Sequence, residues 1–200
     1  MRFLLASASP RRRELLRNAG FDFDVQPSHI VEEIQPGEPP EEFARRAARE
    51  KAMQVAASCP AGSFVLGADT VVVIDGETLG KPSGRQDATR MLRLLSGRTH
   101  QVHTGICLVR APGEIEALKH ETTFVTFREL DEEEIRSYVE SGEPLDKAGA
   151  YAVQGLASRF VTRISGCYFN VVGLPVALVY ETLKPLMKVE VRSQKPEVGR

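Results

Sequence analysis

Neither sign of charge is in excess in this sequence. Its 200 residues include 26 lysines and arginines and 27 aspartates and glutamates, so the formal net charge at pH 7 is −1. A protein that coats DNA or RNA needs a broad basic surface, which this balance does not provide. Tryptophan is absent and aromatic residues make up 6% of the chain, so platforms on which unpaired bases stack are also scarce. The composition therefore argues against a long nucleic acid as the partner.

The sequence also lacks a long apolar run and a disulfide framework. No stretch approaches the roughly 20 apolar residues that span a bilayer, and the apolar part of residues 1–10 is too short for a secretory signal. The cysteines Cys59, Cys107 and Cys167 are odd in number, lie far apart and do not show zinc-ligand spacing. We therefore expect a cytoplasmic protein with reduced thiols and no membrane partner.

Helical and extended patterns alternate along the chain. Ser9, Pro10 and Gly20 are residue types typical of an N-cap, a first helical position and a helix end. Asp75-Gly76 is a typical hairpin turn, and Ser83 with Gln86 has the pattern of a capping box. Extended segments are expected at 2–6, 21–25, 64–74, 77–79, 99–109, 122–128, 159–164 and 168–172, and helices at 11–19, 40–58, 84–95, 132–140 and 175–187.

These elements predict an α/β fold. Strands alternate with helices but hairpins are also present, so the sheet is expected to be mixed rather than purely parallel. A hydrophobic fraction of 42% in a chain of 200 residues is enough for one core. We predict a single domain over residues 1–187, with a mixed β-sheet, flanking helices and two lobes around a cleft, followed by a polar tail over 188–200.

A cluster of hydroxyl and guanidinium groups follows the first expected strand. Ser7, Ser9, Arg11 and Arg12 surround the start of the first helix. Free backbone N–H groups, the helix dipole and two cations all favour an anion of phosphate size at such a position. An ordinary capped helix with solvated arginines is an equally good interpretation of this segment alone.

Two charged residues fall where burial is expected. Asp69 interrupts an apolar strand, and Lys51 lies on the apolar stripe of the helix over 40–58. An ionised carboxylate buried without a partner costs several kcal/mol, so Asp69 must meet a cation, a metal ion or an open cleft. A structural ion pair between Lys51 and Asp69 is one alternative. Glu32 and Glu33 add two carboxylates in a loop, where a solvated acidic pair is the commoner case.

Two further segments have residue types that suit a nucleotide site. Gly80-Lys81-Pro82 can present a lysine to phosphate, although the glycine spacing and the proline exclude a P-loop. The loop over 146–155 contains Tyr151 and Gln154, and an amide can pair with both a donor and an acceptor of a base. On its own, this loop is more typical of a segment held by its own hydrogen bonds.

Taken together, these segments resemble the Maf family of nucleoside triphosphate pyrophosphatases. The matching blocks occur in order from Leu5 to Pro175. They are Leu-Ala-Ser-Ala-Ser-Pro-Arg-Arg from Leu5, Glu32-Glu33, Arg49-Glu50-Lys51-Ala52, Gly67-Ala68-Asp69-Thr70, Gly80-Lys81-Pro82, Leu95-Ser96-Gly97 with His100, Asp146 to Tyr151 with Gln154-Gly155, and Asn170 to Pro175.

The resemblance implies an α/β fold of the inosine-triphosphatase type with a basic cleft. It implies hydrolysis of a nucleoside triphosphate between its α- and β-phosphates with a divalent cation, Mg²⁺ or Mn²⁺, in a role that clears unwanted nucleotides. Asp69 is implied to be the proton acceptor, and Arg11, Thr70 and Gln154 are implied to influence substrate choice. The loop from Tyr151 to Gly155 resembles the subgroup that acts on dTTP and UTP. A 7-methyl-GTP pyrophosphatase of the same family is the alternative.

One mechanism combines the residues with the resemblance. Glu33 and Asp69 ligate the metal ion, and Asp69 takes a proton from the attacking water. Glu33, Lys51 and Lys81 join Asp69 as catalytic residues, which argues against a nucleotide-binding regulatory module without activity. An RNA-binding protein is the weaker rival, and the sequence leaves open whether the chain forms a homodimer. The residues expected to hold the triphosphate are Ser7, Arg11, Arg12, Lys51 and Lys81.

Overall fold

The protein is built on one mixed β-sheet, seen in a computed structural model that describes residues 2–193. The seven-stranded sheet has the order β2-β1-β3-β5-β6-β7, and β4 pairs with β3 outside this path. The strands are β1 (Phe3–Leu5), β2 (Phe23–Val25), β3 (Phe64–Ile74), β4 (Glu77–Leu79), β5 (Thr99–Arg110), β6 (Glu114–Phe127) and β7 (Val161–Ser165). β1 runs parallel to β2 and β3, whereas the other pairs are antiparallel. The predicted mixed sheet is therefore confirmed.

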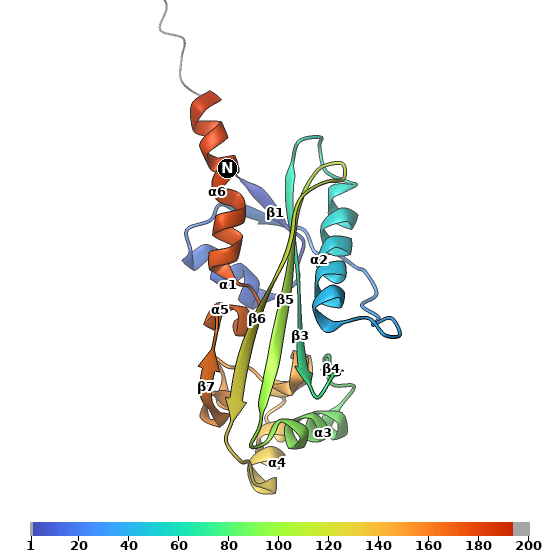
Figure 1. Cartoon of the computed structure of the whole chain (residues 1–200), viewed down its shortest axis with the longest axis vertical. Coiled ribbons are helices and arrows are strands. Elements are labelled where there is room, and N and C mark those ends of the chain that lie inside the picture. Colours follow the sequence, from blue (N-terminus) through green and yellow to red (C-terminus); the bar gives the residue numbers. More distant parts are fainter. Residues whose placement is uncertain (1, 194–200) are drawn as a thin grey trace, which may run out of the picture.

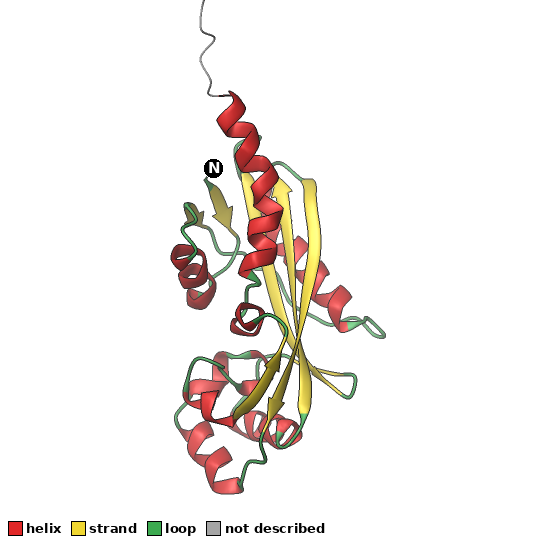
Figure 2. Cartoon of the chain, turned by 60° about the vertical axis from the view of Figure 1, so that its left-hand side comes forward, coloured by secondary structure: helices red, strands yellow, loops and turns green. Residues whose placement is uncertain are grey.

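Helices flank the sheet on both sides and at one end (Figure 1, Figure 2). The α-helices are α1 (Pro10–Asn18), α2 (Pro40–Ala56), α3 (Arg85–Leu95), α4 (Glu132–Glu140), α5 (Tyr168–Val172) and α6 (Val176–Ser193), with 3₁₀ turns at Glu143–Asp146, Ala148–Ala150 and Leu156–Phe160. α2 packs on β3 and β5, and α6 lies across the sheet from it. Within residues 2–193, none of these helices has the length and apolar character needed to cross a membrane.

The long strands connect two lobes that share one core. β3, β5 and β6 extend from the lobe that contains α2 and α6 to the lobe that contains α3 and α4 (Figure 1). A single cluster of buried apolar side chains includes Phe3 on β1, Leu92 on α3, Tyr138 on α4 and Leu183 on α6. This cluster contains side chains from both lobes, and the single domain over residues 1–187 stays a prediction.

Helix α2 lies close to the sheet because both surfaces are made of small residues. A Cβ atom added to Gly105 would lie only 2.2 Å from the carbonyl oxygen of Ala44. This close approach brings the buried face of α2 onto β3, so that Lys51 reaches Asp69. The small residues are Ala44, Ala48 and Ala52 on α2, and Gly67 and Gly105 on the strands.

We expect Gly105→Ala to lower the free energy of unfolding by about 2–3 kcal/mol. The added methyl group would collide with backbone atoms, which cannot move aside as a side chain can, so the loss should lie at the upper end of the usual cost of overpacking a core. Gly113→Ala is the control. Its added Cβ atom would meet the terminal methyl of Met53 at 3.1 Å, and a flexible thioether can move away, so the cost should stay below about 1 kcal/mol. Urea unfolding measures both variants. Equal losses would show that α2 does not depend on the close contact.

One expected strand is a helix in the structure. Residues 168–172 are rich in aromatic and β-branched residues, yet they form α5. The side-chain amide of Asn170 donates to the Val102 carbonyl at 2.9 Å and to Thr123 Oγ1 at 3.0 Å. These bonds tie the short helix to β5 and β6, and such tertiary contacts outweigh local β propensity.

Helix boundaries also differ from the prediction, most clearly at the start of α3 and at the end of α6. α3 begins after Gly84 without a side-chain cap, because the Ser83 backbone N–H donates to Asp87 at 3.0 Å and no capping box with Gln86 forms. α6 continues to Ser193, so the first part of the predicted tail is helical. Its lysine, glutamate and arginine are good helix formers despite their polarity. The remainder of the predicted tail, residues 194–200, lies outside the described residues.

Candidate active site

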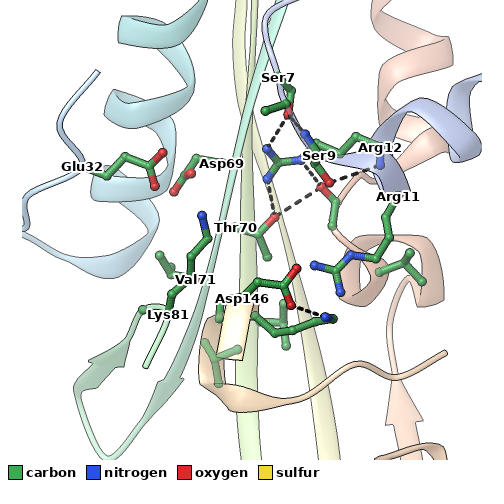
Figure 3. A pocket seen from close by; sticks show the side chains of 18 of the residues that line it. Ser7, Ser9, Arg11, Arg12, Glu32, Asp69, Thr70, Val71, Lys81 and Asp146 are labelled. Carbon is green, nitrogen blue, oxygen red and sulfur yellow. Dashed lines mark hydrogen bonds and ion pairs between the residues drawn. The ribbon is translucent and has the colours of Figure 1, made fainter. Parts of the chain in front are cut away.

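A cavity of about 710 Å³ lies between the two lobes (Figure 3). Its wall is formed by the turn between β1 and α1, the loop before α2, one face of α2, the middle of β3, the turn after β4, the loop over 146–151 and the end of α5. These segments are far apart in the sequence and meet only in the fold. The predicted site residues that line the cavity are Ser7, Arg11, Arg12, Lys51, Asp69, Thr70 and Lys81.

Helix α1 presents its N-terminus to this cavity. Ser9 is the N-cap, and its hydroxyl accepts the backbone N–H of Arg12 at 3.4 Å, while Pro10 occupies the first helical position. The first turn contains no acidic residue, so the helix dipole favours an external anion. Arg11 points toward Asp146 across the cavity (Figure 3). The predicted cap is confirmed, and the cluster faces a cavity, as an anion site requires.

Lys51 joins two carboxylates at the cavity wall. Its Nζ lies 2.6 Å from Asp69 Oδ1 and 2.6 Å from Glu32 Oε1. Lys51 and Asp69 are 7% and 4% exposed, whereas the Glu32 side chain is 39% exposed. The ion pair expected as one alternative is therefore present. Because all three residues line the cavity, the same groups can both stabilise the fold and meet a ligand.

The two carboxylates differ in their electrostatics. Burial raises the pKa of Asp69 above its ordinary value, although Lys51 and Arg12 act in the opposite direction. Partial burial also opposes ionisation of Glu32, but Lys51, followed by Lys81, holds the pKa of Glu32 below its usual value. Carboxylates whose pKa values are pushed apart in this way are typical of sites with separate acid–base roles. Asp69 is suited to accept a proton, and Glu32 is suited to remain ionised.

Glu33 and Gln154 lie outside the cavity wall. Glu33 is exposed, and its carbonyl accepts a hydrogen bond from Arg46 at 2.8 Å. Gln154 is also exposed, and Tyr151 from the same loop lines the cavity in its place. The structure therefore does not bring Glu33 and Gln154 together with the other predicted site residues, and the roles predicted for them stay predictions. Glu32 is the carboxylate that this loop contributes to the cavity. The sequence could not distinguish Glu32 from Glu33, because an irregular loop has no side-chain period that shows which residue points inward.

The sequence matches the family described as Maf-like protein over residues 2–186. The chain belongs to the Maf family. One Maf relative, the dTTP/UTP pyrophosphatase of Koribacter versatilis, is 53% identical over 184 residues, which cover 92% of this chain and 94% of the relative. The dTTP/UTP pyrophosphatase of Moorella thermoacetica is 51% identical over 182 residues, which cover 91% and 93%. A solved nucleoside-triphosphatase / dITP/XTP pyrophosphatase from Mycobacterium abscessus covers 100% of both chains with 16% identity and a TM-score of 0.43.

In this Maf protein, the cavity residue Tyr151 is held by a buried histidine. The Tyr151 hydroxyl and His100 Nε2 are 2.9 Å apart, and the Tyr151 ring packs edge to face on Phe127 with centroids 4.9 Å apart. Among the described residues, His100 Nδ1 has no hydrogen-bond partner. Protonation of His100 would bury a charge and an unpaired N–H group. Burial accordingly lowers the pKa of His100 to about 4.

A pH dependence of stability follows from His100. Its folded-state pKa lies below its ordinary value, so the unfolded chain takes up a proton first as the pH falls, and stability present at neutral pH is lost. We expect this histidine to lower the free energy of unfolding by about 2 kcal/mol between about pH 7 and about pH 5. Urea unfolding of the wild type and His100→Gln at both pH values measures the difference. Equal losses in the two proteins would contradict a neutral His100.

The donor set in the Maf cavity suits a hard divalent cation. Among residues 2–193, no group of three or more His, Cys, Asp or Glu side chains is placed to hold a metal ion alone. Glu32 and Asp69 nevertheless converge, since both contact Lys51 Nζ. Mg²⁺ is commonly bound by one or two carboxylates together with waters and substrate phosphates, and Mn²⁺ accepts the same ligands. The residues therefore fit an ion that binds together with a nucleotide.

Proposed function

We propose that this chain hydrolyses nucleoside triphosphates between the α- and β-phosphates and that dTTP and UTP are its substrates. The observation that carries the proposal is a cavity lined by the cations Arg11, Lys51 and Lys81 and by the buried carboxylate of Asp69. Relatives that are 51% and 53% identical bear the name dTTP/UTP pyrophosphatase, which supports the choice of substrates. Release of the monophosphate and pyrophosphate would clear unwanted nucleotides.

The cations hold the triphosphate and stabilise the leaving group. Arg11 and Lys81 flank the cavity, and Ser7 and the N-terminus of α1 lie between β3 and α5 at its wall (Figure 3). As the bond to the α-phosphorus breaks, negative charge increases on the departing pyrophosphate. Fixed cations and helix N–H groups directed at that charge stabilise the transition state more than the bound substrate, and this difference accelerates the reaction.

Asp69 takes a proton from the attacking water. The water oxygen bonds to the α-phosphorus, and the bond from that phosphorus to the oxygen bridging to the β-phosphate breaks, so this oxygen leaves with the pyrophosphate. The raised pKa of Asp69 makes it a stronger base than a free carboxylate. Glu32 remains ionised and keeps its contact with Lys51, which holds the lysine beside Asp69.

The same two carboxylates also fit the divalent cation. We propose that Glu32 and Asp69 would hold Mg²⁺ or Mn²⁺. When bound, such an ion supplies positive charge to the triphosphate. Removal of divalent cations with a chelator should therefore stop turnover and leave the fold intact, because the core of residues 2–193 consists of buried apolar side chains.

Glu32→Gln should lower kcat/KM by up to about 100-fold, because it removes the negative charge that holds Lys51 and is proposed to hold the metal ion. The neighbouring change Glu33→Gln is the matched control, because it removes the same charge from an exposed side chain outside the cavity. Its kcat/KM should stay within about twofold of the wild type. Pyrophosphate release with dTTP and Mg²⁺ measures both. A larger loss in Glu33→Gln would return the role to Glu33.

A panel of nucleotides tests the proposed function as a whole. Purified protein is incubated with dTTP, UTP and 7-methyl-GTP in the presence of Mg²⁺ or Mn²⁺, and monophosphate and pyrophosphate are measured. We expect dTTP and UTP to be cleaved with the higher kcat/KM. Preference for 7-methyl-GTP would move the chain to the other subgroup, and absence of turnover would favour a nucleotide-binding regulatory module. Light scattering of the same sample distinguishes a monomer from a homodimer.

A further inference from the structure

The loop that carries Glu32 lies on the surface of the protein. Residues 31–37 are all exposed, so burial contributes little to holding this segment in place. Glu32 nevertheless lines the cavity (Figure 3), and its Oε1 lies 2.6 Å from Lys51 Nζ. An exposed segment of irregular backbone has many alternative conformations. Contacts outside the core must therefore select the conformation in which Glu32 reaches the cavity.

Arg46 on α2 supplies such contacts. Its Nη2 donates to the carbonyl of Glu33 at 2.8 Å, one residue after Glu32. Its Nε and Nη2 donate to the two carboxylate oxygens of Glu38 at 2.6 and 2.7 Å. Among the described residues, the bond to the Glu33 carbonyl is the only hydrogen bond made by the backbone of residues 30–34. One guanidinium therefore holds this loop at two points.

The Arg46 side chain is itself held in place. Its Nη1 donates to Glu50 at 3.1 Å, one turn further along α2, and its guanidinium carbon lies 5.3 Å from the centre of the Phe43 ring. The Arg46 and Glu38 side chains are 19% and 11% exposed, so their bidentate pair is screened less than a pair on the open surface. Phe43 lines the cavity. The anchor of the loop is therefore joined to the cavity wall.

The contact with Lys51 does not replace this anchor. It fixes only the carboxylate of Glu32, and the Glu32 side chain is 39% exposed, where solvent weakens an ion pair. The same ammonium also contacts Asp69 at 2.6 Å. On the other side of Glu32, the backbone is held at His29, whose N–H donates to a side chain of α2 at 2.7 Å. The backbone anchor next to Glu32 is therefore the one from Arg46.

We propose that Arg46 is a positioning residue for triphosphate hydrolysis, because it holds the loop backbone where Glu32 enters the cavity. This inference rests on the proposed function, in which Glu32 holds Lys51 beside Asp69 and fits the divalent cation. It also assigns a role to Glu38, which is the second attachment point of the loop on the same guanidinium. Arg46 does not line the cavity, so it acts on the reaction through Glu32 rather than by contact with the nucleotide.

Arg46→Lys tests the inference. Lysine keeps the positive charge but lacks the planar fork that bonds Glu38 and the Glu33 carbonyl together, so kcat/KM should fall by about tenfold. On a Glu32→Gln background, Arg46→Lys should cause no further loss, because the charge that it positions is already absent. Pyrophosphate release with dTTP and Mg²⁺ measures kcat/KM in all variants, and thermal unfolding shows that each is folded.

Cleavage by a glutamate-specific protease reports on the loop without any substrate. A protease cuts a segment when its backbone leaves the anchored conformation. Arg46→Lys should therefore raise the rate of cleavage after Glu32 and Glu33 by at least about threefold, as measured by mass spectrometry of the fragments. Equal cleavage rates in the wild type and the variant would overturn the inference.

Arg128→Lys is the matched control. Arg128 also makes a bidentate pair, with Glu134, and it donates to the Arg159 carbonyl at 3.1 Å and lies 5.6 Å from the centre of the Phe160 ring. These contacts lie in the lobe of α3 and α4 and do not involve the loop of Glu32. The change should therefore leave kcat/KM and cleavage of that loop within about twofold of the wild type.

The outcomes separate this inference from the proposed function. Wild-type kcat/KM in folded Arg46→Lys, or a further tenfold loss on the Glu32→Gln background, would overturn the inference and leave the proposed function standing. If Arg46→Lys does not fold, Glu38→Gln takes its place, because it removes the charge at the second attachment point, and wild-type kcat/KM in that variant would overturn the inference. An inactive wild-type protein would overturn both proposals.

Discussion

Asp69→Asn is expected to lower kcat by at least about 1,000-fold while the protein stays folded, since loss of a general base typically costs between about 100- and 10,000-fold. Asparagine has nearly the same shape and keeps an oxygen that can accept from Lys51 Nζ, which lies 2.6 Å from Asp69. The amide cannot take a proton from water. Pyrophosphate release gives kcat, and thermal unfolding shows that the fold is retained.

Asp75→Asn is the control for this change. Asp75 is exposed in the β3–β4 turn and has a φ of 50°, a conformation that asparagine also tolerates. Asp75→Asn removes one negative charge from the surface and should leave kcat within about twofold of the wild type. Retention of more than about a tenth of wild-type kcat in Asp69→Asn would exclude Asp69 as the base.

Lys51→Met is expected to destabilise the protein by about 3–5 kcal/mol, which is the usual result of removing one partner from a buried ion pair. Asp69 is 4% exposed, so its carboxylate can regain only part of its hydration, from the cavity side, when the lysine is lost. Glu32 stays nearby and adds repulsion of like charge. Urea unfolding measures the loss. Stability equal to the wild type would show that water or another cation already compensates Asp69.

The double variant Lys51→Met, Asp69→Asn separates the structural role of the pair from its chemical role. Because the uncompensated charge is removed together with its partner, most of the lost stability should return, as buried pairs replaced by neutral groups often cost little. Turnover should remain absent, since the base is missing. If the double variant recovered turnover, the ion pair would be purely structural.

Local sequence signals predict the framework that positions the site. The Ser9 cap and the Asp75-Gly76 hairpin depend on a few neighbouring residues, and both are present in the structure. The helical period of α2 likewise places Lys51 on its buried face. The partner of Lys51 could be anticipated as well, because a carboxylate in the apolar strand β3 requires a cation.

Features that depend on distant contacts could not be predicted in the same way. The choice of Glu32 over Glu33 is made by Lys51, which lies on another element. α5 is helical because Asn170 bonds to two strands, although its residues favour a strand. The bond from Arg46 to the Glu33 carbonyl likewise follows from the way the loop lies along α2. None of these partners is adjacent in the sequence.

Hydrolysis of dTTP in water labelled with ¹⁸O tests the central claim most directly. Attack of water on the α-phosphorus places the label in dTMP and leaves the pyrophosphate unlabelled, and mass spectrometry of the two products shows which carries it. We predict label in dTMP only, in the wild type with Mg²⁺. Label in pyrophosphate would mean attack on the β-phosphorus, and release of dTDP with orthophosphate would mean cleavage at the γ-phosphate. Either result would contradict the proposed reaction.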